Sequence, residues 1–153
     1  MHALKLKIPP LAVAVLVAAL MRLVTWAAPA CSFVIPASNL LAAGFAVAGV
    51  FMIALGVASF RRAETTVNPM KPDTASSLVL SGVYRVTRNP MYLGFLLLLA
   101  GWASFLSNAL AFLLLPTFVF YMNYFQIEPE ERALAARFGH QFVDYKSRVH
   151  RWL

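Results

Sequence analysis

Four long apolar segments constrain the fold of this chain more than any other feature of its sequence. They cover residues 8–28, 40–60, 90–106 and 110–127. A hydrocarbon layer requires about 20 mostly apolar residues in helical form. Only a short turn at Ser107 and Asn108 separates the last two segments, so they are expected to form an antiparallel hairpin. The sequence predicts an all-α integral membrane protein with about four transmembrane helices in a single membrane domain.

The composition excludes an ordinary soluble domain. Hydrophobic residues make up 61% of the 153 residues and charged residues 12%, whereas average globular proteins have roughly 45–50% and 25%. The net charge of +7 would suggest a nucleic-acid partner in a soluble protein. Here the basic residues flank the apolar segments, so we expect no nucleic-acid partner.

The distribution of basic residues predicts the orientation in the membrane, because lysine and arginine favour cytoplasmic loops. All basic residues except Arg22 would share one side if both termini were cytoplasmic; they are Lys5, Lys7, Arg61, Arg62, Lys71, Arg85, Arg88, Arg132, Arg137, Lys146, Arg148 and Arg151. We therefore expect a multi-pass protein with both termini in the cytoplasm, in the inner membrane if the source is prokaryotic. The apolar segments contain no acidic residue, which argues against an ion-coupled transporter.

The first polar region is the loop at residues 61–89, which leads into the third apolar segment. Pro90 suits the first turn of a helix, where its missing N–H is not needed. Asn89 is then placed to cap that helix. The free backbone N–H groups and positive dipole end of such a helix suit a carboxylate. Arg88 and Tyr92 lie on either side of this helix start.

The second polar region follows the fourth apolar segment and is expected to form an amphipathic cytoplasmic helix at residues 129–153. Glu130 and Glu131 lie in its first turn, where acidic side chains are favourable. Gly139 is a position where this helix could bend or break. Apolar residues recur at helical spacing along one face; they are Leu134, Phe138, Phe142, Tyr145, Val149 and Trp152.

The two polar regions would meet, because the third and fourth segments form a tight hairpin. An arginine, a helix N-terminus, tyrosines and paired carboxylates would then lie together at the membrane surface. Such a site suits a small zwitterion or cation from water and an apolar second substrate from the lipid. The alternative is a non-enzymatic membrane scaffold or interaction protein, in which these features serve only structure and partner binding. The single Cys31 offers no metal cluster, and we expect no metal site.

The run from Ser81 to Gly94, followed by Glu130, Glu131 and the pattern to Val149, resembles the isoprenylcysteine carboxyl methyltransferase family. Membrane phospholipid methyltransferases share parts of this pattern. The resemblance implies a methyltransferase that uses S-adenosylmethionine without a Rossmann sheet. It implies cofactor contacts at Ser76, Ser77, Leu78, Val79, Tyr84, Asn89, Pro90, Met91, Tyr92 and Glu130.

The remaining expected site residues are Arg88 and Glu131 for catalysis and Gln126 for the substrate. Arg88 would neutralise an acceptor carboxylate or shape the loop, and Glu131 would support Glu130 or face water. The chain differs from eukaryotic members at Asn89, where they have histidine, and at Gln126, where they have a substrate-binding arginine. The expected acceptor is a lipophilic small molecule or lipidated substrate, namely a prenylcysteine, a phospholipid or a thiol. The sequence leaves the acceptor and the oligomeric state open.

Overall fold

The computed structural model describes residues 8–63 and 77–153, and this part of the chain is helical without any strand. Its only β-type pairing is an isolated bridge between Ser32 and Asn108. The elements are α1 Pro10–Ala27, η2 Pro29–Cys31, α2 Ser38–Arg62, η4 Gly82–Arg85, α3 Pro90–Leu106, α4 Ala109–Tyr121, η5 Met122–Ile127, α5 Glu128–Phe138 and α6 His140–Arg148. The all-α prediction is confirmed for the described residues.

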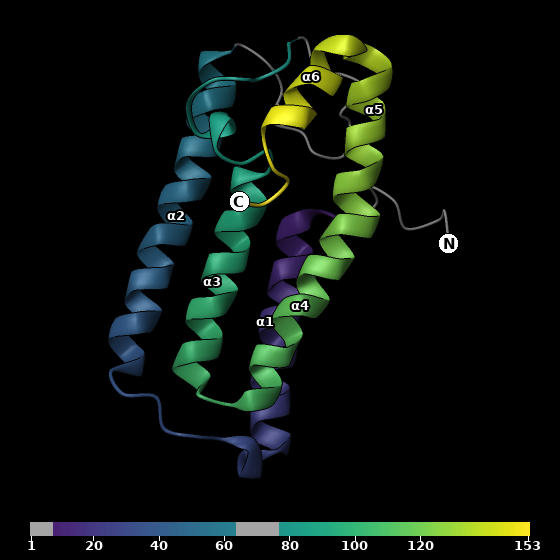
Figure 1. The fold of residues 1–153 in the computed structure, drawn as a ribbon. Helices are drawn as coiled ribbons and strands as arrows, with labels where there is room; N and C mark the ends of the chain where they lie inside the picture. Colours follow the sequence, from purple (N-terminus) through teal and green to yellow (C-terminus); the bar gives the residue numbers. More distant parts are fainter. Residues whose placement is uncertain (1–7, 64–76) are drawn as a thin grey trace.

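The long helices run side by side, with α3 between α2 and the pair formed by α1 and α4 (Figure 1). Three helical stretches are long and apolar enough to cross a membrane: Pro10–Ala27, Ser38–Arg62 and Ala109–Phe138. The apolar helix Pro90–Leu106 is shorter. The molecule is therefore a membrane protein with three to four helices suited to span the bilayer. The end of the bundle where α2 ends and α3 and α5 begin is called the site end below.

Glycines allow α2 and α3 to approach closely. A Cβ on Gly94 would lie 2.7 Å from the carbonyl oxygen of Gly49 and 2.5 Å from Ile53 Cγ1. Small residues at such positions let membrane helices pack backbone to backbone. Gly49 and Gly56 of α2 lie at close contacts with α3, whereas a Cβ on Gly44 would meet nothing within 4 Å.

The turn opposite the site end is fixed by Asn108, which is fully buried. Its side-chain oxygen accepts a hydrogen bond from the Leu110 N–H at 3.0 Å and caps α4. Its Nδ2 donates to the Ala28 carbonyl at 3.0 Å and to Ser32 Oγ at 3.1 Å. This one side chain therefore ties the end of α1 to the α3–α4 hairpin.

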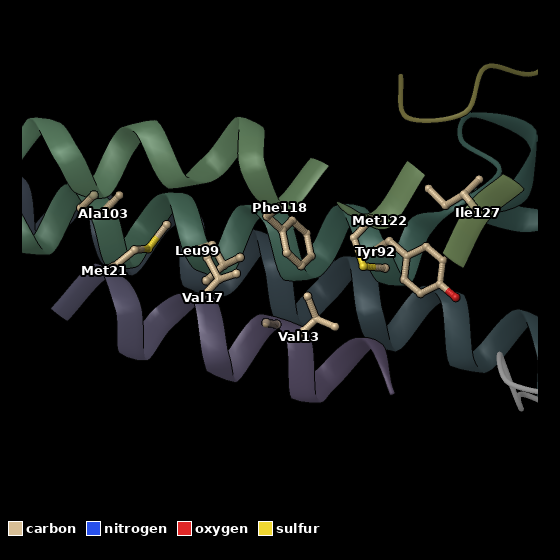
Figure 2. Packing of buried hydrophobic residues seen from close by; sticks show 11 residues of the cluster. Val13, Val17, Met21, Tyr92, Leu99, Ala103, Phe118, Met122 and Ile127 are labelled. Atoms are coloured by element: carbon tan, nitrogen blue, oxygen red, sulfur yellow. The ribbon is translucent and has the colours of Figure 1, made fainter. Parts of the chain in front are cut away.

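The buried apolar core lies among α1, α3 and the α4–η5 stretch. Figure 2 shows side chains of the three segments pointing toward one another. Met21, Phe118 and Met122 are completely buried there. The core continues to Tyr92 and Ile127 and so reaches the site end.

The C-terminal segment differs from the single helix expected at residues 129–153. The α4 helix passes through the π-helical turn η5 directly into α5, and α5 ends at Phe138. Gly139 has φ +51°, a left-handed backbone conformation that glycine adopts easily, and it starts the separate helix α6. After Arg148 the backbone turns extended at Val149, and residues 149–153, called the tail below, run back toward the start of α3 (Figure 1).

Candidate active site

Arg88 and Glu131 form a buried ion pair at the site end. Arg88 Nη2 lies 2.8 Å from Glu131 Oε1, and the two side chains are only 9% and 10% exposed. Arg88 precedes α3 and Glu131 lies in the first turn of α5, so the pair joins the two polar regions that the sequence predicted would meet. Buried charges of this kind require a partner, because desolvation is costly.

Glu131 has two further cationic partners. Arg151 Nε lies 3.1 Å from Oε1 and Arg151 Nη2 lies 2.9 Å from Oε2, which is the fork geometry of a bidentate arginine–carboxylate pair. Lys146 Nζ lies 3.3 Å from Oε2. Hydrogen bonding to Glu131 raises the pKa of Arg151. The Glu131 carboxylate is thus held by three cations and is occupied within the protein.

Glu130 has a different environment. Its Oε2 accepts a hydrogen bond from the hydroxyl of the buried Tyr92 at 3.1 Å. Within residues 8–63 and 77–153, no cationic side chain lies within ion-pair distance of Glu130. Burial, and the nearby Glu130 carboxylate, raise the pKa of Tyr84, so this phenol stays neutral. Among the described residues, Glu130 is therefore a half-buried carboxylate that bonds one neutral phenol, lies near a second and has no counter-ion.

Asn89 occupies the cap position of α3, but its side chain does not cap the helix. Nδ2 instead donates to the carbonyl of Arg151 at 2.9 Å. The expected side-chain cap is therefore wrong, and the Asn89 amide is directed toward the tail instead. In the first turn of α3, the backbone N–H groups of Met91 and Tyr92 therefore donate no hydrogen bond to the Asn89 side chain, and the positive end of the helix lacks a side-chain cap.

Gln126 is completely buried in the π-helical turn, four positions before Glu130. Its Nε2 donates to the carbonyl of Ile8 at 2.6 Å, which ties the start of α1 to η5. Its Oε1 is buried without a hydrogen-bond partner. π-Helical turns often occur at functional sites, and this one places an unsatisfied acceptor inside the bundle.

The other residues expected to contact the cofactor divide between two places. Tyr84 and Tyr92 lie near Glu130, whereas Pro90 and Met91 line the α2–α3 interface, where a Cβ on Gly56 would lie 3.3 and 2.8 Å from their Cγ atoms. Ser77 donates to the Ala63 carbonyl at 3.1 Å, and Val79 is buried while Leu78 is half-buried. Ser76 lies outside the described residues.

The sequence did not indicate the role of the tail. Its carbonyls accept hydrogen bonds from the residues that precede α3, and Trp152 Nε1 donates to Asn123 Oδ1 of η5 at 3.0 Å. The sequence signals in this segment are its basic residues, which predict orientation, and Val149 and Trp152, which continue the apolar face. Lys146 and Arg151 proved to be partners of Glu131.

A separate apolar hollow of about 350 Å³ lies between α2 and α3 in the half of the bundle away from Glu130. Its lining residues are Ala42, Ala43, Ala46, Leu98, Gly101, Trp102 and Phe105. No charged group lines it, so it does not belong to the site.

Comparison with known proteins identifies the family. The sequence model described as phospholipid methyltransferase matches residues 37–141. The chain belongs to this phospholipid methyltransferase family. A protein of Haemophilus influenzae described as uncharacterized is 44% identical over 63 residues, which is 41% of this chain and all of that protein. No solved structure matches the chain significantly.

A plant relative of this chain supports the resemblance found in the sequence. Protein-S-isoprenylcysteine O-methyltransferase B of Arabidopsis thaliana is 31% identical over 108 residues, which cover 66% of this chain and 55% of that enzyme. The chain thus aligns with only about half of the plant enzyme. Family and relative together indicate a membrane methyltransferase. The family match ends at residue 141 and so includes Arg88, Glu130 and Glu131 but not the tail.

Proposed function

We propose that this protein transfers a methyl group from S-adenosylmethionine to a lipophilic acceptor at the cytoplasmic face of the membrane. The observation that carries the proposal is Glu130, a half-buried carboxylate without a cationic partner in the described chain. A carboxylate at such a position is stabilised by a cationic ligand. The methyl donor implied by the family carries both a sulfonium and an ammonium group.

The surrounding residues fit the rest of this cofactor. The uncapped N-terminus of α3 suits its carboxylate, because backbone N–H groups and the helix dipole favour an anion there. Tyr84 and Tyr92 provide aromatic surface beside Glu130. We propose that Glu130, Tyr84, Tyr92 and the start of α3 at Asn89 hold the cofactor.

When bound, the cofactor supplies a methyl carbon already activated by its sulfonium. The protein then mainly has to align the acceptor with that carbon, at about 3 to 3.5 Å, and to exclude water. Little acid–base chemistry is required for a carboxylate or thiolate acceptor. This agrees with a site in which Glu131 is neutralised by its own cations.

We propose that the acceptor reaches the site from the lipid, on the side of Gln126. Within the described chain the buried Oε1 of Gln126 has no hydrogen-bond partner, so it would accept a hydrogen bond from a polar group of the methyl acceptor. The acceptor class remains a prenylcysteine, a phospholipid or a thiol.

Arg88 has a loop-shaping role in this proposal. It forms an ion pair with Glu131 and also donates hydrogen bonds to the main-chain carbonyls of Lys146 and Val149.

The test is cofactor binding by the purified full chain in detergent or nanodiscs. Calorimetry should show saturable binding of S-adenosylhomocysteine, and Glu130→Gln should weaken S-adenosylmethionine binding by about tenfold or more, because charge-assisted hydrogen bonds are strong. The matched control is Glu128→Gln, which removes a carboxylate of the same helix paired with the exposed Arg132. Absence of saturable binding would remove the enzymatic proposal and leave the scaffold alternative.

Methyl transfer itself is tested with a methyl-labelled cofactor. Membranes containing the protein should yield labelled lipid, peptide or thioether product that membranes with Glu130→Gln do not. Mass spectrometry of the labelled product identifies the acceptor.

A further inference from the structure

The tail is fastened to the start of α3 by a continuous row of hydrogen bonds. The carbonyls of Val149, His150 and Arg151 accept bonds from Arg88 Nη1, the Arg88 backbone N–H and Asn89 Nδ2. The two residues that lead into α3 are thus bonded to three consecutive tail residues.

The side chains of the tail extend these contacts to two other elements. Arg151 bonds both oxygens of Glu131 on α5. Trp152 donates to Asn123 of η5 at 3.0 Å and packs against the buried core. The tail therefore connects α3, α5 and η5, the elements that carry Asn89, Glu130 and Gln126.

Two properties of the proposed cofactor site depend on these contacts. The carbonyl of Arg151 accepts a hydrogen bond from Asn89 Nδ2 and orients this side chain toward the tail, and the Asn89 side chain makes no capping bond to α3. The guanidinium of Arg151 helps to neutralise Glu131, the immediate neighbour of Glu130. Consecutive residues on a helix point about 100° apart, so holding Glu131 toward the tail fixes Glu130 toward Tyr92.

We infer that Arg151 and Trp152 are positioning residues of the cofactor site, although they lie outside residues 37–141 that match the family. Neither residue acts on the cofactor directly. Arg151 sets the orientation of the Asn89 and Glu131 side chains. Trp152 anchors the tail to η5, which keeps Arg151 within bonding distance of these two residues. This inference rests on the proposed function, because it concerns the site in which S-adenosylmethionine would bind.

The test compares tail variants of the full chain for S-adenosylhomocysteine binding by calorimetry. Arg151→Gln should weaken binding by about tenfold, because it removes a bidentate charged pair. Arg151→Lys should restore part of the affinity, since an ammonium can reach one carboxylate oxygen. Trp152→Phe should weaken binding several-fold by removing only the indole N–H. The matched control is Arg148→Gln, an exposed arginine whose Nε bonds the Asp144 carbonyl of its own helix.

Hydrogen exchange of residues 87–92 gives a readout of tail docking that does not require the cofactor. Arg151→Gln and Trp152→Phe should both reduce protection of this segment, and Arg148→Gln should not. Reduced protection with unchanged affinity would overturn the inference, because the tail would then have only a structural role. Unchanged protection in the two tail variants would also overturn it. If the wild-type chain does not bind S-adenosylhomocysteine, the proposed function fails instead. If Arg151→Gln does not fold, the same comparison with Trp152→Phe decides.

Discussion

Glu130 and Glu131 are neighbours on α5, yet their carboxylates have opposite surroundings. Glu131 is bonded by Arg88 and Arg151 and lies 3.3 Å from Lys146. Glu130 bonds a neutral phenol. One carboxylate is therefore occupied by the protein's own cations, whereas the other has no cationic partner within the described part of the chain.

Glu131→Gln should destabilise the protein by about 3–5 kcal/mol, because it leaves the buried Arg88 guanidinium without its counter-charge. Denaturant-induced unfolding in detergent measures this loss. Glu128→Gln is the control, since its pair with Arg132 spans 3.5 Å at the surface and should contribute at most about 1 kcal/mol. Equal effects of the two substitutions would contradict the structural role assigned to Glu131.

Tyr92→Phe should weaken cofactor binding roughly 5- to 30-fold, because it removes the hydroxyl that orients Glu130. The measurement is the dissociation constant of S-adenosylhomocysteine. Tyr145→Phe removes another buried hydroxyl, which donates to the Tyr84 carbonyl at 2.7 Å. It should lower the free energy of unfolding by about 1 kcal/mol with a smaller effect on affinity. A larger effect of Tyr145→Phe on affinity would show that Glu130 is not oriented through Tyr92.

Gly94→Ala should destabilise the bundle by about 1–3 kcal/mol through overpacking. The new methyl group would lie 2.7 Å from the Gly49 carbonyl oxygen, so α2 and α3 would have to separate. Gly44→Ala is the matched control, because nothing lies within 4 Å of the added methyl group. It should be neutral or stabilising by up to about 1 kcal/mol, as expected for alanine in a helix. Thermal unfolding of both variants in one detergent gives the comparison.

Asn108→Ala should cost about 1–2 kcal/mol, because it removes the α4 cap and the bonds to Ala28 and Ser32. Thr117→Ala provides the control, since its exposed hydroxyl bonds only the Leu113 carbonyl of its own helix. A loss for Thr117→Ala as large as that for Asn108→Ala would argue against Asn108 as the link between α1 and the hairpin.

Local sequence signals were sufficient to predict the helical architecture. Apolar length predicts each long helix, Pro90 marks the start of α3, and the short turn at Ser107 forces the α3–α4 hairpin. These features depend on residues close together in the chain. The meeting of Arg88 with Glu131 followed from them, because a hairpin brings both of its ends together.

The partners of individual side chains could not be predicted in this way. Asn89 is a good cap by residue type, yet it bonds the Arg151 carbonyl 62 positions later. The sequence marked Gly139 as a position where the helix could break, as it does, but helix propensity did not reveal that the tail returns to α3. Such contacts depend on competition between donors and acceptors that only the folded chain brings into range.

Hydrophobicity, proline placement and turn placement act locally, so they were enough to predict a helical membrane protein with a polar region at one end of its bundle. The folded arrangement of distant elements was needed to show that Glu131 is neutralised by three cations while Glu130 has no cationic partner among the described residues. Sequence neighbours on a helix point in different directions, and their surroundings are set by distant elements. The different surroundings of the two carboxylates therefore depend on the packing of the tail against α3 and α5.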